Sequence, residues 1–187
     1  KRVENQLDIR TADVSFIIDE IKLKFSNDKS FSDIADFDNI GIFGHSFAGC
    51  TAIKSAYNDN RIDAVLGLDA YFLPLSSALI KKDLNKPFVH IGQVSWGNSN
   101  NYNLMKQFGK NNSKDSYHFS VAESKHNDYT DFSQFTKLTR KFGSGKISPK
   151  IIRNVMNNIM LGFFDANLKG GEDFDARLLE YLASEFK

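Results

Sequence analysis

The sequence predicts an α/β fold in which a mostly parallel sheet is flanked by helices. Segments with strand character alternate with segments with helix character along the chain. The strand segments are continuous apolar runs, which is typical of parallel strands covered on both faces. The chain has 187 residues, 41% of them hydrophobic and 25% charged, and this suits a single domain with its own core. We therefore expect one domain over residues 1–187.

The N-terminal part predicts a helix followed by a polar loop. Thr11 or Asp13 is expected to cap the start of this helix. Residues 26–38 are mostly polar and predict the loop. The apolar residues of the helix recur at steps of three and four, as on one helix face: Val14, Ile17, Ile18, Ile21 and Phe25.

The rest of the chain predicts four strands and further helices. Ser148 and Pro149 are typical of a helix start, and that helix should end near Leu168, before two glycines. The strands are expected at 40–43, 64–68, 88–91 and 117–121, and the other helices at 47–57, around 104–108, and at 174–186.

The segment from Ile40 to Cys50 predicts a strand, a tight turn at Ser46, and a helix. A serine at such a turn is typical of a nucleophile elbow, in which small neighbours avoid collisions and the hydroxyl projects above the sheet. The usual pattern is Gly-x-Ser-x-Gly, whereas here Ala48 takes the last place and Gly49 follows. The alternative interpretation is that Ser46 only caps the helix.

A nucleophilic serine needs a base, and the base needs an orienting carboxylate. Asp69 ends the strand after the elbow, and His126 follows the last strand, so both should lie at the edge of the sheet where Ser46 lies. Asp69 could instead cap the segment that follows it. The other candidates fit less well: His45 within the elbow, His90 and His118 within strands, Asp63 at the opposite end of its strand, and Asp128 and Asp131 at a helix start.

Composition argues against several other classes of function. The net charge is +1, which gives no electrostatic reason to expect nucleic-acid binding. The single cysteine, Cys50, cannot form an internal disulfide, and no residue cluster suggests a metal. No apolar run is long enough for a membrane span, and the first residues lack a signal-peptide core.

Three ordered blocks resemble the platelet-activating-factor acetylhydrolase family of α/β-hydrolases. They read GIFGHSFAG, GLDAYFLPL and HNDYTDF, and the resemblance extends from about Asp38 to Gly170. It implies a catalytic triad of Ser46, Asp69 and His126 that needs no metal or organic cofactor. Ala48 and Tyr129 depart from the family pattern, which has glycine and phenylalanine there.

The family fold also implies several strands before the elbow strand, which about forty residues cannot supply. We therefore expect this chain to be the C-terminal part of an α/β-hydrolase fold that lacks its N-terminal strands. The Phe47 N–H would be one oxyanion donor, and a second donor would come from elsewhere. The exposed edge of the elbow strand would bind the missing N-terminal segment or a second copy of the chain.

The leading hypothesis is a serine ester hydrolase that acts on a small apolar ester or a lipid with a short or oxidised acyl group. Its apolar walls could include Tyr71, Phe72, Leu73 and Trp96, although at least half of these should be core residues. The competing hypothesis is a non-catalytic domain that binds an apolar ligand or is inactive without its N-terminal portion.

Overall fold

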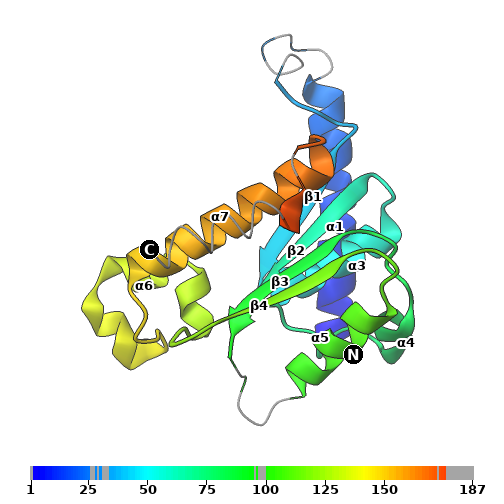
Figure 1. Ribbon diagram of the computed structural model, residues 1–187. Coiled ribbons are helices and arrows are strands. Elements are labelled where there is room, and N and C mark those ends of the chain that lie inside the picture. Colours follow the sequence, from blue (N-terminus) through cyan, green and yellow to red (C-terminus); the bar gives the residue numbers. More distant parts are fainter. Residues whose placement is uncertain are drawn as a thin grey trace.

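A computed structural model describes residues 2–25, 28, 30, 34–94, 96, 100–171 and 173–175 of the chain. Its centre is a four-stranded sheet in the order β1-β2-β3-β4 (Figure 1). All three strand pairings are parallel, which confirms the predicted α/β fold. The strands are β1 (Ile40–His45), β2 (Ile62–Leu68), β3 (Phe88–Gln93) and β4 (Ser116–Val121).

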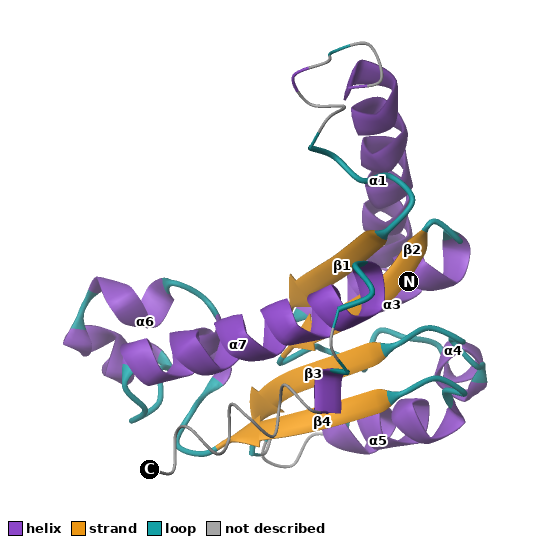
Figure 2. Cartoon of the chain, turned by 45° about the horizontal axis from the view of Figure 1, so that its top comes forward, coloured by secondary structure: helices purple, strands orange, loops and turns teal. Residues whose placement is uncertain are grey.

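Helices cover both faces of this sheet and form two apolar cores (Figure 2). Val65 of β2 faces the core made with the N-terminal helices and α5, whereas its neighbour Leu66 faces the core made with α7. This alternation follows from the two-residue period of a strand. The helices of the first face are α1 (Arg2–Phe25), α3 (Phe47–Asn58), α4 (Ser77–Lys81) and α5 (Asn101–Asn111), and the second face carries α7 (Pro149–Leu168).

Only the two inner strands are buried on both faces. Residues of β2 and β3 are almost all buried, whereas β1 and β4 carry exposed residues at alternate positions. On β1, the side chain of Phe43 is 56% exposed. The outer strands have a neighbour on one side within the described residues, so their faces are less completely covered than the sequence predicted.

The first helix differs from its prediction. It begins at Arg2, and Thr11 lies inside it, where its hydroxyl donates to the carbonyl of Leu7 at 2.8 Å. Leu7 and Thr11 are buried, whereas Ile17 is 51% exposed. The first ten residues are mostly polar, so the spacing of apolar residues did not indicate that the helix begins there. Figure 1 shows the C-terminal part of α1 extending beyond the sheet, which leaves much of the predicted apolar face uncovered.

The remaining elements follow the sequence with small additions. The predicted helix at 149–168 is confirmed, whereas the predicted helix at 174–186 lies mostly outside the described residues. Helix α4 and the short helices η1 (His126–Tyr129) and η2 (Lys137–Phe142) were not predicted. Helix α6 (Phe132–Phe135) begins directly after Asp131, which was expected at a helix start. Among the described residues, no helix combines the length and apolar character that crossing a bilayer requires.

Candidate active site

Ser46 occupies a strained turn between β1 and α3. Its backbone has φ 57° and ψ −119°, a region that residues other than glycine seldom adopt. The turn is tied to the neighbouring strand, because the Ser46 N–H donates to the Leu68 carbonyl at 3.0 Å and the Ser46 carbonyl accepts from the Tyr71 N–H at 2.9 Å. These hydrogen bonds fix the serine at the carboxyl edge of the sheet.

Two glycines make the tight turn possible. A Cβ atom on Gly44 would lie 2.4 Å from the carbonyl carbon of Ala48, and one on Gly49 would lie 2.5 Å from the Cβ of Ala70. Either contact is closer than real Cβ atoms tolerate, so the backbone requires glycine at both positions. Ala48, at the position where the motif has its last glycine, is exposed. Gly49, rather than residue 48, is therefore the position at which α3 packs closely against the segment after β2.

Ser46, His126 and Asp69 form a continuous hydrogen-bonded series. The Ser46 hydroxyl lies 2.9 Å from Nε2 of His126, and Nδ1 of His126 lies 2.7 Å from Oδ2 of Asp69. Asp69 is fully buried at the end of β2, whereas His126 is 33% exposed at the start of η1. With Asp69 ionised, Nδ1 carries the proton and donates to the carboxylate, which leaves Nε2 free to accept from the serine.

Asp69 receives more hydrogen bonds than the sequence suggested. Tyr102 OH donates to Oδ1 at 2.5 Å and Trp96 Nε1 donates to Oδ1 at 2.9 Å. The side-chain amide of Gln93 donates to Oδ2 at 2.9 Å. Burial opposes the charged carboxylate, but the hydrogen bonds from His126, Tyr102 and Trp96 outweigh it and lower the pKa of Asp69. Gln93 ends β3 at the same edge of the sheet, so its position in the sequence could have indicated that it lies near Asp69.

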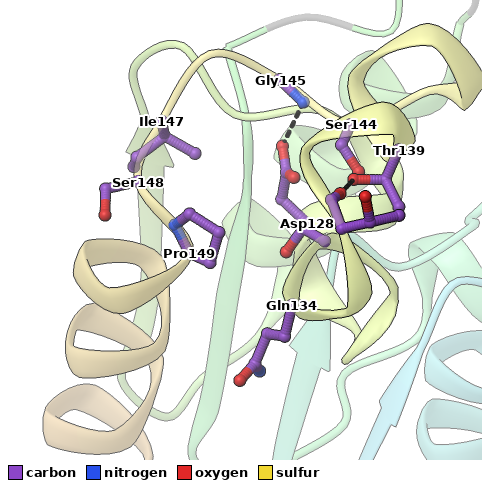
Figure 3. Close-up of a pocket in the computed structure, with 10 residues that line it drawn as sticks. Asp128, Gln134, Thr139, Ser144, Gly145, Ile147, Ser148 and Pro149 are labelled. Atoms are coloured by element: carbon purple, nitrogen blue, oxygen red, sulfur yellow. Dashed lines mark hydrogen bonds between the residues drawn. The ribbon is translucent and has the colours of Figure 1, made fainter.

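Asp128 holds in place the segment that carries His126. One oxygen of this carboxylate accepts from the N–H of Lys125 at 2.8 Å and from the N–H of Gly145 at 2.6 Å. Figure 3 shows the second contact, beside a cavity of about 370 Å³. A Cβ atom on Gly145 would lie 2.0 Å from the Glu123 carbonyl oxygen, so only glycine allows this approach.

The other histidines have local partners, as predicted. His45 Nε2 donates to the carbonyl of His126 at 3.0 Å, and burial followed by the nearby His126 lowers the pKa of His45. The buried His90 accepts from the Ala70 N–H at 3.1 Å and faces Nδ1 of His118 at 2.9 Å.

The other aspartates also lie apart from the serine. Asp63 accepts from the N–H of Ile40, at the opposite end of the strands. Asp131 precedes α6 as its N-cap residue.

The four predicted apolar wall residues divide between surface and core. Tyr71 and Trp96 stack with ring centroids 5.5 Å apart, and the Trp96 ring meets the His126 ring at 4.9 Å. Leu73 is 41% exposed. Phe72 is fully buried and packs against Phe88 and Phe108, so its predicted contact with substrate is wrong. The chain turns back into the core at this position because the Phe72 N–H donates to the buried side chain of Asn101.

The sole cysteine does not compete with Ser46 as a nucleophile. Cys50 is buried in α3, and burial raises the pKa of its thiol to about 12. Among the described residues, no group of three or more histidine, cysteine, aspartate or glutamate side chains is arranged to hold a metal ion. The contacts from Ser46 to His126 and from His126 to Asp69 have the geometry that activation of a hydroxyl for nucleophilic attack requires.

A family model for platelet-activating factor acetylhydrolase, isoform II, matches residues 5–180 of the chain. The chain belongs to this family. The acetylhydrolase-family assignment agrees with two curated relatives, each named platelet-activating factor acetylhydrolase. The protein from Gallus gallus is 27% identical over 146 residues, and the one from Canis lupus familiaris is 26% identical over 166 residues. These alignments cover 76% and 87% of this chain but only 34% and 35% of the relatives.

A solved structure is similar to this chain in its fold. A ferulic acid esterase from Streptomyces cinnamoneus superimposes with a TM-score of 0.74 at 22% sequence identity. The match covers 92% of this chain and 52% of the esterase chain. The four-stranded parallel sheet of this acetylhydrolase-family chain therefore resembles part of an α/β-hydrolase.

Proposed function

We propose that the protein hydrolyses esters with short or oxidised acyl groups, including those of phospholipids, through an acyl-enzyme on Ser46. The observation that carries this proposal is the series from Ser46 through His126 to Asp69, with contacts of 2.9 Å and 2.7 Å. Membership of an acetylhydrolase family supports an ester as the substrate class. The strained backbone of Ser46 supports a functional turn rather than a simple helix cap.

In the proposed reaction, the Ser46 oxygen attacks the ester carbonyl while Nε2 of His126 takes the hydroxyl proton. The buried Asp69 carboxylate stabilises the resulting imidazolium through Nδ1. His126 then returns the proton to the departing alkoxide, which leaves an acyl group on Ser46. A water molecule, deprotonated by the same imidazole, attacks this acyl-enzyme and releases the acid.

The oxyanion of the tetrahedral intermediate needs at least two donors. Phe47 is the first residue of α3, and its N–H has no acceptor within the helix. It therefore serves as one donor in this proposal. The second donor belongs to a part of the fold beyond the four described strands, and Tyr71 and Trp96 form apolar walls beside His126.

Turnover of a p-nitrophenyl acetate series and labelling by a fluorophosphonate test the proposal. We expect Ser46→Ala to abolish labelling and to lower the rate by several orders of magnitude. Ser55→Ala is the matched control, because it removes a buried hydroxyl from the same helix α3 without touching the triad. Full esterase activity in Ser46→Ala would place the chemistry elsewhere. A form extended at its N-terminus that neither labels nor turns over ester would support a non-catalytic domain.

A further inference from the structure

Tyr102 takes no part in the proposed reaction steps, yet it contacts the buried acid. It is the second residue of α5, and its hydroxyl donates to Oδ1 of Asp69 at 2.5 Å. A hydrogen bond of this length from a hydroxyl to a carboxylate is among the stronger kinds in proteins. His126 binds the other oxygen, Oδ2. Tyr102 and His126 therefore hold the two oxygens of one carboxylate.

The strand beside Asp69 leaves room for this phenol. A Cβ atom on Gly92 would lie 2.6 Å from the Tyr102 hydroxyl and 2.9 Å from Oδ1 of Asp69. A larger residue in β3 would therefore push the phenol away from the carboxylate. Glycine inside a strand often marks such a close approach.

Two histidines fix the ring of Tyr102 from the side. The rings of His90 and His118 each have centroids 5.6 Å from that of Tyr102, in edge-on arrangements. The Ala70 N–H can only donate, so Nε2 of His90 must accept and the His90 proton lies on Nδ1. That proton points at Nδ1 of His118, 2.9 Å away. His118 therefore carries its proton on Nε2, which faces the Ser120 hydroxyl at 3.1 Å.

The protonation states of His90 and Tyr102 agree with these donor and acceptor roles. Burial, then the neighbouring His118, lowers the pKa of His90 to about 3, so this imidazole is neutral near pH 7. Burial and the hydrogen bond to Asp69 raise the pKa of Tyr102, so its phenol stays a donor. The series begins at the N–H of Ala70, the residue after Asp69, and so fixes the backbone next to the acid.

We propose that Tyr102 is a positioning residue, which holds Oδ1 of Asp69 so that Oδ2 remains directed at Nδ1 of His126. This inference rests on the proposed triad and extends it by one residue. Trp96 shares Oδ1 but lies on the substrate side, against the His126 ring, whereas Tyr102 lies on the helix behind the carboxylate. The role predicts an effect on the titration of His126 that a merely structural tyrosine would not produce.

The test follows the His126 ring by NMR across pH in Tyr102→Phe. The chain has four histidines, so a His126→Gln spectrum assigns the signal. We expect the midpoint of the titration to fall, because a carboxylate that turns away from Nδ1 stabilises the imidazolium less. The matched control is Tyr57→Phe, whose hydroxyl donates to the carbonyls of Leu79 and Lys82, and its midpoint should equal that of the native protein.

A second variant keeps the inference testable if Tyr102→Phe does not fold. Gly92→Ala keeps the phenol but crowds both it and Oδ1 of Asp69, and it should lower the midpoint as well. An unchanged or raised midpoint, or an equal fall in Tyr57→Phe, overturns the role of Tyr102. In protein that turns over ester, kcat of Tyr102→Phe should fall about tenfold while KM stays within about twofold. Because the NMR readout needs no turnover, its failure is distinct from the failure of Ser46→Ala to stop hydrolysis.

Discussion

Strand β2 carries one aspartate near its start and another directly after its end, and the two have different surroundings. Asp63 accepts a single backbone N–H, from Ile40, at the edge of the sheet away from Ser46. Asp69 is fully buried and binds His126. The chemical identity of the residue therefore says little about its role, and its position along the strand decides it.

We expect Asp69→Asn to lower kcat severely, by up to about 10⁴-fold, because asparagine keeps the shape but favours the wrong tautomer of the histidine. Asp63→Asn should have little effect, since the asparagine oxygen can still accept from the Ile40 N–H. The measurement is steady-state turnover of a short-chain ester by both variants. Small and equal losses in the two would reject Asp69 as the orienting acid.

The pH dependence of activity also follows from Asp69. The hydrogen bonds around it lower its pKa, so the carboxylate stays charged throughout the weakly acidic range. The group that must lose a proton for catalysis is then the imidazole of His126, since only a neutral ring can take the serine proton. We expect kcat/KM to rise from acid to neutral pH through a single ionisation. A flat profile, or two ionisations on the acid side, would contradict this assignment.

At the scale of elements, the short turn that carries His126 is fixed by its own capping residue. Asp128 accepts from the backbone on both sides of a loop, at Lys125 and at Gly145. We expect Asp128→Ala to lower the free energy of unfolding by about 1–3 kcal/mol, because it leaves the buried N–H of Gly145 and the part-buried N–H of Lys125 without their acceptor. Asp131→Ala should change the free energy by less than about 0.5 kcal/mol, since the side chain of Asp131 accepts an exposed hydrogen bond from the side chain of Gln134. Urea denaturation of both variants measures the difference, and equal losses would contradict it.

The elements could be predicted where burial and turn chemistry act locally. The strand runs, the helix after Ser46 and the Pro149 start all match the structure, because apolar runs and caps encode them directly. The start of α1 was missed because only Leu7 and Thr11 of its first turns face the core. The short helix α4 was missed because it has five residues, too few for a periodic pattern.

The candidate site residues at the strand ends could be predicted from the sequence, but the side chains that hold them in place could not. Ser46, Asp69 and His126 follow from strand order and loop position. The supports of Asp69 come from side-chain directions that no local pattern encodes, as Tyr102 illustrates: it reaches back from α5 across β3 to the carboxylate. Phe72 was misassigned for the same reason, because an aromatic residue after a buried strand can turn either to the surface or to the core.

At the scale of the whole molecule, β1 has an outer edge and an exposed aromatic face. Phe43 is 56% exposed, and the strand order leaves β1 at the edge of the described sheet. The chain spans only about a third of the length of its curated relatives and about half of the matched esterase. We propose that further strands of the same protein cover this edge and carry the second oxyanion donor.

This proposal predicts that residues 1–187 alone form a poor enzyme. Losing one oxyanion donor costs about 3 kcal/mol, or a factor of about a hundred to a thousand in rate. The test compares this stretch with a form extended at its N-terminus, by mass in solution and by turnover of a short-chain ester. We expect the extended form to be faster by that factor. A monomeric and fully active product from residues 1–187 would overturn the proposal, and a dimer that matches the extended form would make a second copy the partner.

The series from Ser46 to His126 spans 80 positions of one uninterrupted chain segment, with Asp69 between them. The proposed nucleophile, orienting acid and base thus follow strands β1, β2 and β4 of a single stretch. A recombination event needs only two crossover points to move all three together, with their relative geometry fixed by the sheet that travels with them. The surroundings that choose the substrate can then be exchanged separately, so the reaction and its specificity are able to diverge at different rates.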